Sequence, residues 1–250
     1  MPEIDVPSHA TALLNLYRKK ESSVAEALAL SGEKGHNTLD YTNKNTLDFV
    51  EKLYQEYLPI FAEQERKIFH IGGDEFYVLP EKSNVEFVNF MNQLNRFLNK
   101  KGFTTRIWND GFTKADLSSF DKNLEVTYWS LTGIADKDDV SEKSLRSKEY
   151  KATAQEISNA GFRLLNFNAY YNYLVPSEKV LSDEALHYTI NDLLTHWEID
   201  EFELNTNEKL NSLDNVVGSA VSIWGEEAKE FSDSEIFEQT KRVVSAFLEK

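Results

Sequence analysis

Short apolar runs alternate with longer amphipathic segments along most of this chain, and this alternation is what most constrains the fold. The runs have the length of strands, and several of them end at glycine or at polar residues. Strands that alternate with helices are typical of a parallel sheet covered by helices, so the sequence predicts an α/β fold. The six predicted strands are Glu3–Asp5, Lys67–Gly72, Thr104–Asn109, Leu124–Trp129, Phe162–Phe167 and Ala220–Trp224.

Each predicted strand after the first ends in polar or aromatic residues. One such group per strand favours a (β/α)8 barrel of the TIM type, whose carboxyl face holds the functional site. A closed barrel needs eight strands, so the pattern indicates a barrel truncated to about six βα units, strands 3 to 8. Without an internal repeat or linker, residues 1–250 are expected to form one domain. The predicted helices include Thr46–Phe61, Val85–Asn99, Ala185–Trp197 and a final helix near Glu235–Leu248.

The composition excludes several classes of function. Hydrophobic residues make up 41% of the 250 residues, enough for a buried core, and no apolar run has the length of a membrane span. The absence of cysteine excludes disulfides, thiolate metal sites and cysteine catalysis. A net charge of −15 argues against nucleic acid and against an anionic membrane surface as partners. A neutral or cationic ligand fits this charge better.

Residues 70–76 read His-Ile-Gly-Gly-Asp-Glu-Phe and carry the strongest functional signal. Asp74 and Glu75 follow an apolar run and a Gly-Gly break, so they are expected at the carboxyl end of a buried strand. The string Gly72–Phe76 also spells the signature of diguanylate cyclases, in which a hairpin holds GTP and the acids bind magnesium. This alternative requires further motifs upstream, and the stretch Gly32–Lys52 supplies only a Gly-His pair. The strands after residue 100 would also have no role in so small a domain.

The same heptapeptide resembles the central catalytic motif of glycoside hydrolase family 20, the β-N-acetylhexosaminidases. Further motifs match in the order of that family, and together they span nearly the whole chain. Within the family the chain is most similar to bacterial surface hexosaminidases. The matching motifs lie at residues 3–9, 106–111, 127–130, 165–173 and 222–226.

The resemblance implies a role for each of the two acids. Family 20 uses the 2-acetamido group of the substrate as the nucleophile, in place of a second carboxylate of the enzyme. Glu75 would be the general acid that later activates water, and Asp74 would orient the acetamido group and stabilise the developing positive charge. Glu75 must then be protonated while Asp74 is ionised, and two neighbouring like charges are expected to separate their pKa values in this way.

The resemblance also implies a sugar pocket. Tyr173 would steady the acetamido carbonyl with its hydroxyl, and Glu226 would hold sugar hydroxyls. The tryptophans at three strand ends are expected to form the walls: Trp108, Trp129 and Trp224. The fourth, Trp197, lies on a helical stretch and is expected in the core.

Three further residues are expected to support the catalytic acid from behind: Asp5, His9 and His70. A divalent metal site would need three or four convergent ligands. Because the family pattern accounts for these side chains without a metal, no metal and no cofactor are expected.

Two alternatives concern activity and context. Members of the family begin the barrel with two strands ahead of the Glu3–Asp5 element, and those strands supply an arginine that holds the terminal sugar. The chain is therefore expected to be part of a longer secreted or cell-surface protein, or else a truncated, inactive remnant that still binds sugar. The expected partner is a carbohydrate with terminal N-acetylglucosamine or N-acetylgalactosamine. Its linkage and the oligomeric state of the protein stay open.

Overall fold

A six-stranded parallel sheet forms the centre of the molecule. The computed structural model describes residues 1–76, 84–134, 138–204, 209–229 and 231–250. Within them the sheet has the order β1-β2-β3-β4-β5-β7, and all neighbours run parallel. The predicted α/β fold is confirmed. The strands are β1 (Glu3–Val6), β2 (Ile68–Gly72), β3 (Thr104–Trp108), β4 (Glu125–Tyr128), β5 (Arg163–Asn166) and β7 (Val216–Ser219).

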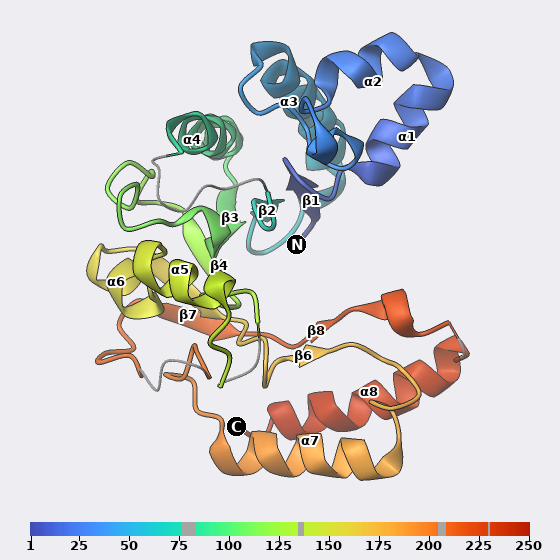
Figure 1. Ribbon diagram of the computed structural model, residues 1–250, viewed down its shortest axis with the longest axis vertical. Coiled ribbons are helices and arrows are strands. Elements are labelled where there is room, and N and C mark those ends of the chain that lie inside the picture. The colour runs from blue at the N-terminus through green and yellow to red at the C-terminus, as the bar shows by residue number, and fades with distance from the viewer. Residues whose placement is uncertain (77–83, 135–137, 205–208, 230) are drawn as a thin grey trace.

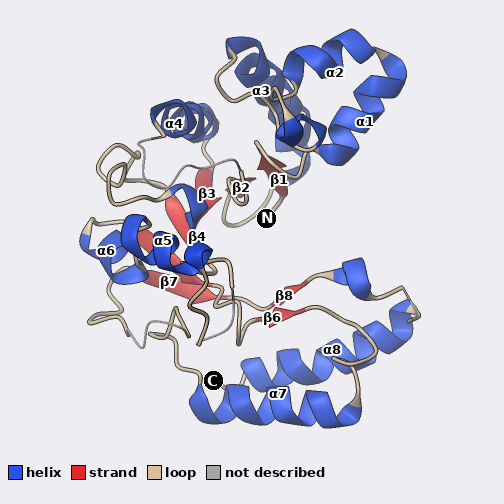
Figure 2. Ribbon diagram, viewed as in Figure 1, coloured by secondary structure: helices blue, strands red, loops and turns tan. Residues whose placement is uncertain are grey.

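Helices lie on the outer side of this curved sheet, as in part of a barrel wall (Figures 1 and 2). All four predicted helices form, with shifted boundaries. The first ends at Tyr57 because a 3-10 turn containing Pro59 follows it. The α-helices are α1 (Thr11–Lys20), α2 (Ser22–Leu28), α3 (Lys44–Tyr57), α4 (Val85–Lys100), α5 (Glu142–Tyr150), α6 (Ala154–Asn159), α7 (Asp183–His196) and α8 (Asp233–Phe247).

The main core lies between the sheet and helices α1 to α4 and α6, whereas α7 and α8 pack in separate clusters, and β2 contributes to the main core. All five residues of β2 are buried, which explains why this strand reads as a continuous apolar run and does not alternate. Phe69 of β2 packs on Tyr54 of α3, with ring centroids 4.7 Å apart, and on Phe103 at 6.4 Å. The strand that precedes the two acids is therefore fixed on both of its faces.

A buried carboxylate joins three strands near their amino ends. Glu125 at the start of β4 is 1% exposed, and its oxygens lie 2.9 Å from Arg106 Nε and 2.7 Å from Arg163 Nη1. A buried carboxylate is tolerated when it is paired in this way. Because Arg106 belongs to β3 and Arg163 to β5, the two ion pairs favour the register of these strands.

The sixth strand of the sheet differs from the prediction. Ala220–Trp224 was predicted, but the strand that pairs with β5 is β7, four residues earlier. Ser222–Ile223 (β8) pairs instead with Tyr173–Leu174 (β6) in a separate two-stranded sheet. The pattern around β7 is hard to recognise because Gly218 interrupts a run of only two valines. The rearrangement carries Trp224 to the side of Tyr173.

The number of six strands in the sheet is confirmed for the described residues. Their assignment to strands 3 to 8 of an eight-stranded barrel, and the single domain over residues 1–250, stay predictions. Within the described ranges, β1 and β7 each have one neighbour in this sheet. No helix in the described part of the chain is both long and apolar enough to cross a membrane.

Candidate active site

The two adjacent acids leave the carboxyl end of β2 through a tight double-glycine turn. Gly72 has φ +76° and Gly73 has φ +96°, values that favour glycine. A Cβ on Gly72 would lie 2.6 Å from Cα of Asp5, so the chain passes directly against β1 at this point. The turn buries most of Asp74, whose side chain is 18% exposed, and leaves that of Glu75 59% exposed.

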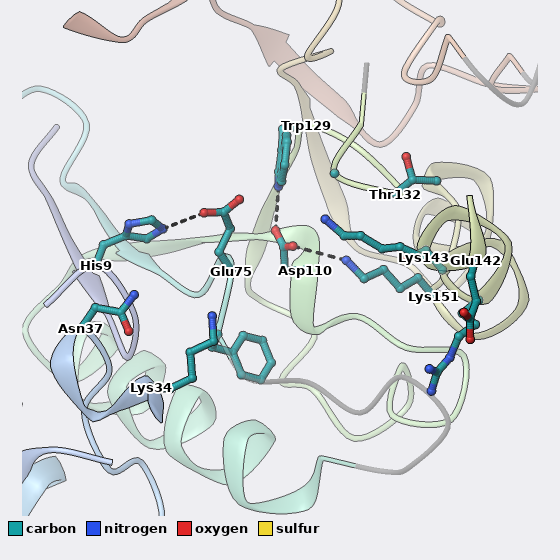
Figure 3. Close-up of a pocket in the computed structure, with 14 residues that line it drawn as sticks. His9, Lys34, Asn37, Glu75, Asp110, Trp129, Thr132, Glu142, Lys143 and Lys151 are labelled. Carbon is teal, nitrogen blue, oxygen red and sulfur yellow. Dashed lines mark hydrogen bonds and ion pairs between the residues drawn. The ribbon is translucent and has the colours of Figure 1, made fainter. Parts of the chain in front are cut away.

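His9 joins both acids from the loop after β1. Its Nε2 lies 3.5 Å from Asp74 Oδ2 and 3.4 Å from Glu75 Oε2, and Figure 3 shows its contact with Glu75. Hydrogen bonds to Asp74 and then to Glu75 raise the pKa of His9 to about 11, so the ring is protonated at neutral pH. His9 and Glu75 both have positive φ values, +56° and +47°. Two non-glycine residues in this strained region meet at one site, a pattern typical of functional centres.

The pKa shifts of the two acids differ from the expected pattern. The hydrogen bond from His9 lowers the pKa of Glu75. Burial raises the pKa of Asp74, but hydrogen bonds with His9 and Asp5 outweigh it and lower the pKa overall. Both acids are therefore ionised at neutral pH in this structure, because His9 contacts both of them. The expectation of a protonated Glu75 beside an ionised Asp74 is not met in this structure.

Asp5 and Asp74 are the neighbouring acids that differ in protonation state, because the pKa of Asp5 is raised and that of Asp74 is lowered. Burial, followed by the charge of Asp74, raises the pKa of Asp5 well above its usual value. Asp5 Oδ1 also accepts a hydrogen bond of 3.1 Å from the backbone N–H of Gly73. A neutral Asp5 beneath an ionised Asp74 holds the second acid in place without adding a further negative charge.

His70 lies under the site and is buried. Its Nδ1 accepts a hydrogen bond of 3.1 Å from the N–H of Gly72, so the proton of the neutral ring lies on Nε2, which donates to Thr127 Oγ1 at 3.0 Å. Burial lowers the pKa of His70 to about 3. Glu3 Oε1 lies 3.3 Å from Nδ1. His70 therefore acts as a neutral link between β2 and β4 and lies in contact with Glu3 of β1.

The depressed pKa of His70 predicts a loss of stability in acid. The folded state binds the proton less readily than the unfolded chain, whose histidine titrates near 6.5, so this contribution is present above pH 6.5 and is lost as the pH falls toward 3. Between pH 6.5 and about pH 4, His70 should remove about 3 kcal/mol from the free energy of unfolding. Urea unfolding over this range should give a shallower pH dependence for His70→Gln than for the wild type.

The matched control for this measurement is His187→Gln, which changes an exposed histidine on α7. Its curve should run parallel to that of the wild type. Parallel curves for His70→Gln and the wild type would contradict the assignment of a neutral, buried His70.

Three of the four predicted aromatic residues of the sugar pocket come together. Trp129 stacks on Tyr173 with ring centroids 6.0 Å apart and an interplanar angle of 16°. Trp224 lies 5.8 Å from Tyr173 and is 37% exposed. Trp108 differs, because it is only 3% exposed, donates its indole N–H to Glu3 Oε1 at 2.8 Å and packs on His70. It lies at the base of the site, while the other three form an accessible wall.

Asp110 and Lys151 are site residues that sequence reasoning did not identify. Trp129 donates its indole N–H to Asp110 Oδ2 at 2.6 Å, and Lys151 Nζ lies 3.3 Å from Oδ1 (Figure 3). Burial raises the pKa of Asp110, and the charge of Lys151 opposes that effect. Asp110 belongs to the motif at residues 106–111, but its partner lies 41 positions along the chain. Glu3 was likewise part of a motif without an assigned role.

A cavity of about 650 Å³ lies beside Glu75 and adjoins the aromatic wall at Trp129. Trp129 lines both, whereas Trp108, Tyr173 and Trp224 do not line the cavity. Glu75 lines this cavity, and its charge also acts on Tyr173 of the aromatic wall. The lining consists of His9, Lys34, Asn37, Glu75, Phe76, Asp110, Trp129, Thr132, Gly133, Glu142, Lys143, Arg146, Ser147 and Lys151.

Two other expectations concern metal and Glu226. Candidate ligand atoms of Asp5, His9 and Asp74 lie within 4.8 Å of one another. A histidine ligand must be neutral, whereas the two carboxylates favour protonation of His9, so these side chains suit an ion pair better than a metal. The absence of a metal stays a prediction.

The backbone of Glu226 lies in the 3-10 turn Gly225–Glu227, but its side chain is outside the described part of the structure.

Comparison with known proteins identifies the family of the chain. The profile described as glycosyl hydrolase family 20, catalytic domain, matches residues 1–242. The chain belongs to this family of glycoside hydrolases. Among the described residues, both strands that neighbour β2 run parallel to it.

Among solved structures, dispersin B superposes on the entire chain with a TM-score of 0.89 and 32% identity, and 71% of that protein is covered. Lacto-N-biosidase of Bifidobacterium bifidum is 25% identical over 94% of this chain. Beta-hexosaminidase subunit A1 of Dictyostelium discoideum is 26% identical over 91% of it. The chain spans 20% and 39% of the lengths of these two relatives.

Proposed function

We propose that this chain carries the catalytic centre of a β-N-acetylhexosaminidase, which hydrolyses terminal β-linked N-acetylglucosamine or N-acetylgalactosamine with retention of configuration. The observation that carries this proposal is the pair Asp74 and Glu75 at the carboxyl end of β2, beside the aromatic wall. Asp74 is close enough to Tyr173 to be the charge that most affects its hydroxyl. An acid pair beside stacked aromatic rings suits a sugar that carries an acetamido group.

Asp74 is suited to orient the acetamido group. Its Oδ1 is buried and has no hydrogen-bond partner among the described residues. A buried acceptor without a partner is costly, and the N–H of an acetamido group would satisfy it. The negative charge then lies close to the oxazolinium-like positive charge that develops when the acetamido oxygen attacks the anomeric carbon.

Glu75 is suited to protonate the leaving oxygen. In this structure it is ionised and paired with His9. A bound sugar removes water from the carboxylate, and burial of this kind raises the pKa of a carboxyl group. The protonated acid can then donate to the glycosidic oxygen, and its conjugate base can activate the water that opens the cyclic intermediate.

The aromatic residues and the turn after β8 complete the proposed pocket. Trp129 and Trp224 are positioned to pack on the faces of the sugar ring, and Tyr173 between them can donate its hydroxyl to the acetamido carbonyl. Burial raises the pKa of Tyr173, so the hydroxyl keeps its proton. Glu226 is proposed to hold sugar hydroxyls.

The experiment that tests this function compares two aryl glycosides that differ only at C2. The chain should release p-nitrophenol from p-nitrophenyl β-N-acetylglucosaminide and should hydrolyse p-nitrophenyl β-glucoside at least about 1,000-fold more slowly, because the glucoside lacks the nucleophile. Equal rates for the two substrates would contradict substrate assistance.

A titration with N-acetylglucosamine-thiazoline, monitored by tryptophan fluorescence, distinguishes an active enzyme from an inactive remnant that still binds sugar. Tight binding of this mimic of the cyclised intermediate without turnover would identify a sugar-binding remnant. Turnover together with tight binding supports the enzyme.

A further inference from the structure

The charge around the cavity beside Glu75 differs in sign from that of the chain as a whole. The protein has a net charge of −15, yet four lysine and arginine side chains line this one cavity. They come from the 3-10 turn Glu33–His36, from α5 and from the residue that follows α5. Such a local excess of cations concentrates the field inside a concave site. The four cations are Lys34, Lys143, Arg146 and Lys151.

The anions of the cavity account for only part of this positive charge. Glu75 pairs with His9, and Asp110 pairs with Lys151. Figure 3 shows the remaining acid, Glu142, turned away from Asp110 toward the outer edge of the cavity. The charges within these two ion pairs offset each other, and Lys34 and Lys143 can act on a ligand.

Lys143 is the cation best placed to act on a ligand beside the acid. Figure 3 shows its ammonium group next to that of Lys151, on the side of the cavity that faces Asp110 and Glu75. A Cβ on Gly133 would lie 3.4 Å from Lys143 Nζ and 3.5 Å from the ring of Trp129, so the ammonium group lies close to the wall of the pocket. The side chains of Lys143 and Lys34 make no hydrogen bond or ion pair with any residue in the described ranges.

The position of Glu75 defines which part of a substrate enters the cavity. The acid protonates the oxygen that joins the terminal sugar to its leaving group, so the two lie on opposite sides of this carboxyl group. Glu75 lines the cavity and its charge also acts on Tyr173 of the aromatic wall, whereas Tyr173 and Trp224 do not line the cavity. A terminal sugar in the aromatic pocket therefore places its leaving group among the lysines.

We propose that the cavity beside Glu75 is a binding site for a leaving-group sugar that carries an anionic substituent, such as a carboxylate or a sulfate ester, and that Lys143 contacts this anion. The proposal rests on the proposed function, because the aromatic pocket must hold the terminal sugar. An ammonium group binds carboxylate and sulfate oxygens through charge-assisted hydrogen bonds. A neutral sugar alcohol at the same position gains much less.

The test measures the affinity of disaccharides that share one linkage and differ in the charge of the leaving sugar, at C6 or, for glucosamine, at C2. N-Acetylglucosamine is β-1,4-linked to glucuronic acid, glucose 6-sulfate, glucose or glucosamine. Binding is measured by calorimetry with the Glu75→Gln variant, in which hydrolysis is blocked. The glucuronide or the sulfate ester should bind about three- to tenfold more tightly than the glucoside, the range expected for one partly exposed charge pair.

Two variants made in the Glu75→Gln background test whether Lys143 causes the preference for the anionic disaccharides. Lys143→Gln should bring the ratio of affinities close to one. Lys148→Gln makes the same change on the same helix at a residue that does not line the cavity, and it should preserve the ratio. High salt should weaken the preference for the anion, because the lysine is exposed and therefore screened.

The outcomes separate this inference from the proposed function. Equal affinity for the anionic and neutral disaccharides, or tighter binding of the glucosamine form, would overturn the inference while turnover of the aryl glycoside still supports the hexosaminidase. A preference that survives Lys143→Gln would overturn the role of that lysine. A preference for the anion in a chain without turnover would support the site and contradict the catalysis. Absence of all binding would overturn both.

Discussion

Replacing Glu75 by glutamine is expected to lower kcat/KM for chitobiose by about 100- to 10,000-fold, the usual contribution of a general acid or base. Glutamine keeps the shape of the side chain and its position after the Gly-Gly turn, but it has no proton to donate at neutral pH. The effect should be smaller for an aryl glycoside, because p-nitrophenolate leaves without protonation. Steady-state kinetics on both substrates check this expectation.

The comparison of the two substrates makes the result specific. Glu26→Gln removes the same charge from an exposed position on α2 and should leave both rates near those of the wild type. A Glu75→Gln variant that retains more than about a tenth of the wild-type rate on chitobiose would contradict its role as the acid. An equal fall on both substrates would indicate a role in binding.

Replacing Gly72 by alanine is expected to lower the free energy of unfolding by about 3–5 kcal/mol. The position combines a positive φ, +76°, with a space that the chain of β1 already fills, since a Cβ would come within 2.6 Å of Cα of Asp5. Because this contact involves backbone, rotation of a side chain does not relieve it. Urea unfolding followed by circular dichroism measures the loss.

Gly102→Ala is the matched control for the crowding. Gly102 has a similar φ of +81°, but a Cβ there would meet nothing within 4 Å. It should cost only about 1–2 kcal/mol, the price of the backbone strain alone. If the two variants lose equal stability, the close approach of β1 to the turn contributes nothing. Activity should also fall in Gly72→Ala, because the turn carries Asp74 and Glu75.

Much of the sheet was predictable because its central strands are buried on both faces. β2, β3, β4 and β5 read as apolar runs, and each was predicted to within a few residues. The last part of the sheet was not predictable in the same way. β6 and β8 have two residues each, and their partners lie about fifty positions apart in the chain. A pattern within one strand carries no information on such a pairing.

The same distinction applies to the candidate site: features that follow from neighbouring residues were predictable, and contacts between distant residues were not. The positions of Asp74 and Glu75 at a strand end follow from the local sequence, and His9 was expected to support them. The sign of the pKa shift of Glu75 was not predictable, because it depends on the 3.4 Å contact with His9, a residue 66 positions earlier in the chain. Asp110 and Lys151 were missed for the same reason.

The location of Asp5 and Glu3 on β1 has a consequence for how the protein loses function. β1 contributes four residues to the sheet and, within the described ranges, has only β2 beside it. Edge segments of this kind open locally at a lower free energy than the centre of a sheet. Such an opening would withdraw the partners of Asp74 and of His70 while the rest of the core stays intact. Loss of activity would therefore measure the local opening of β1, whereas loss of the circular dichroism signal would measure the cooperative unfolding of the rest of the core.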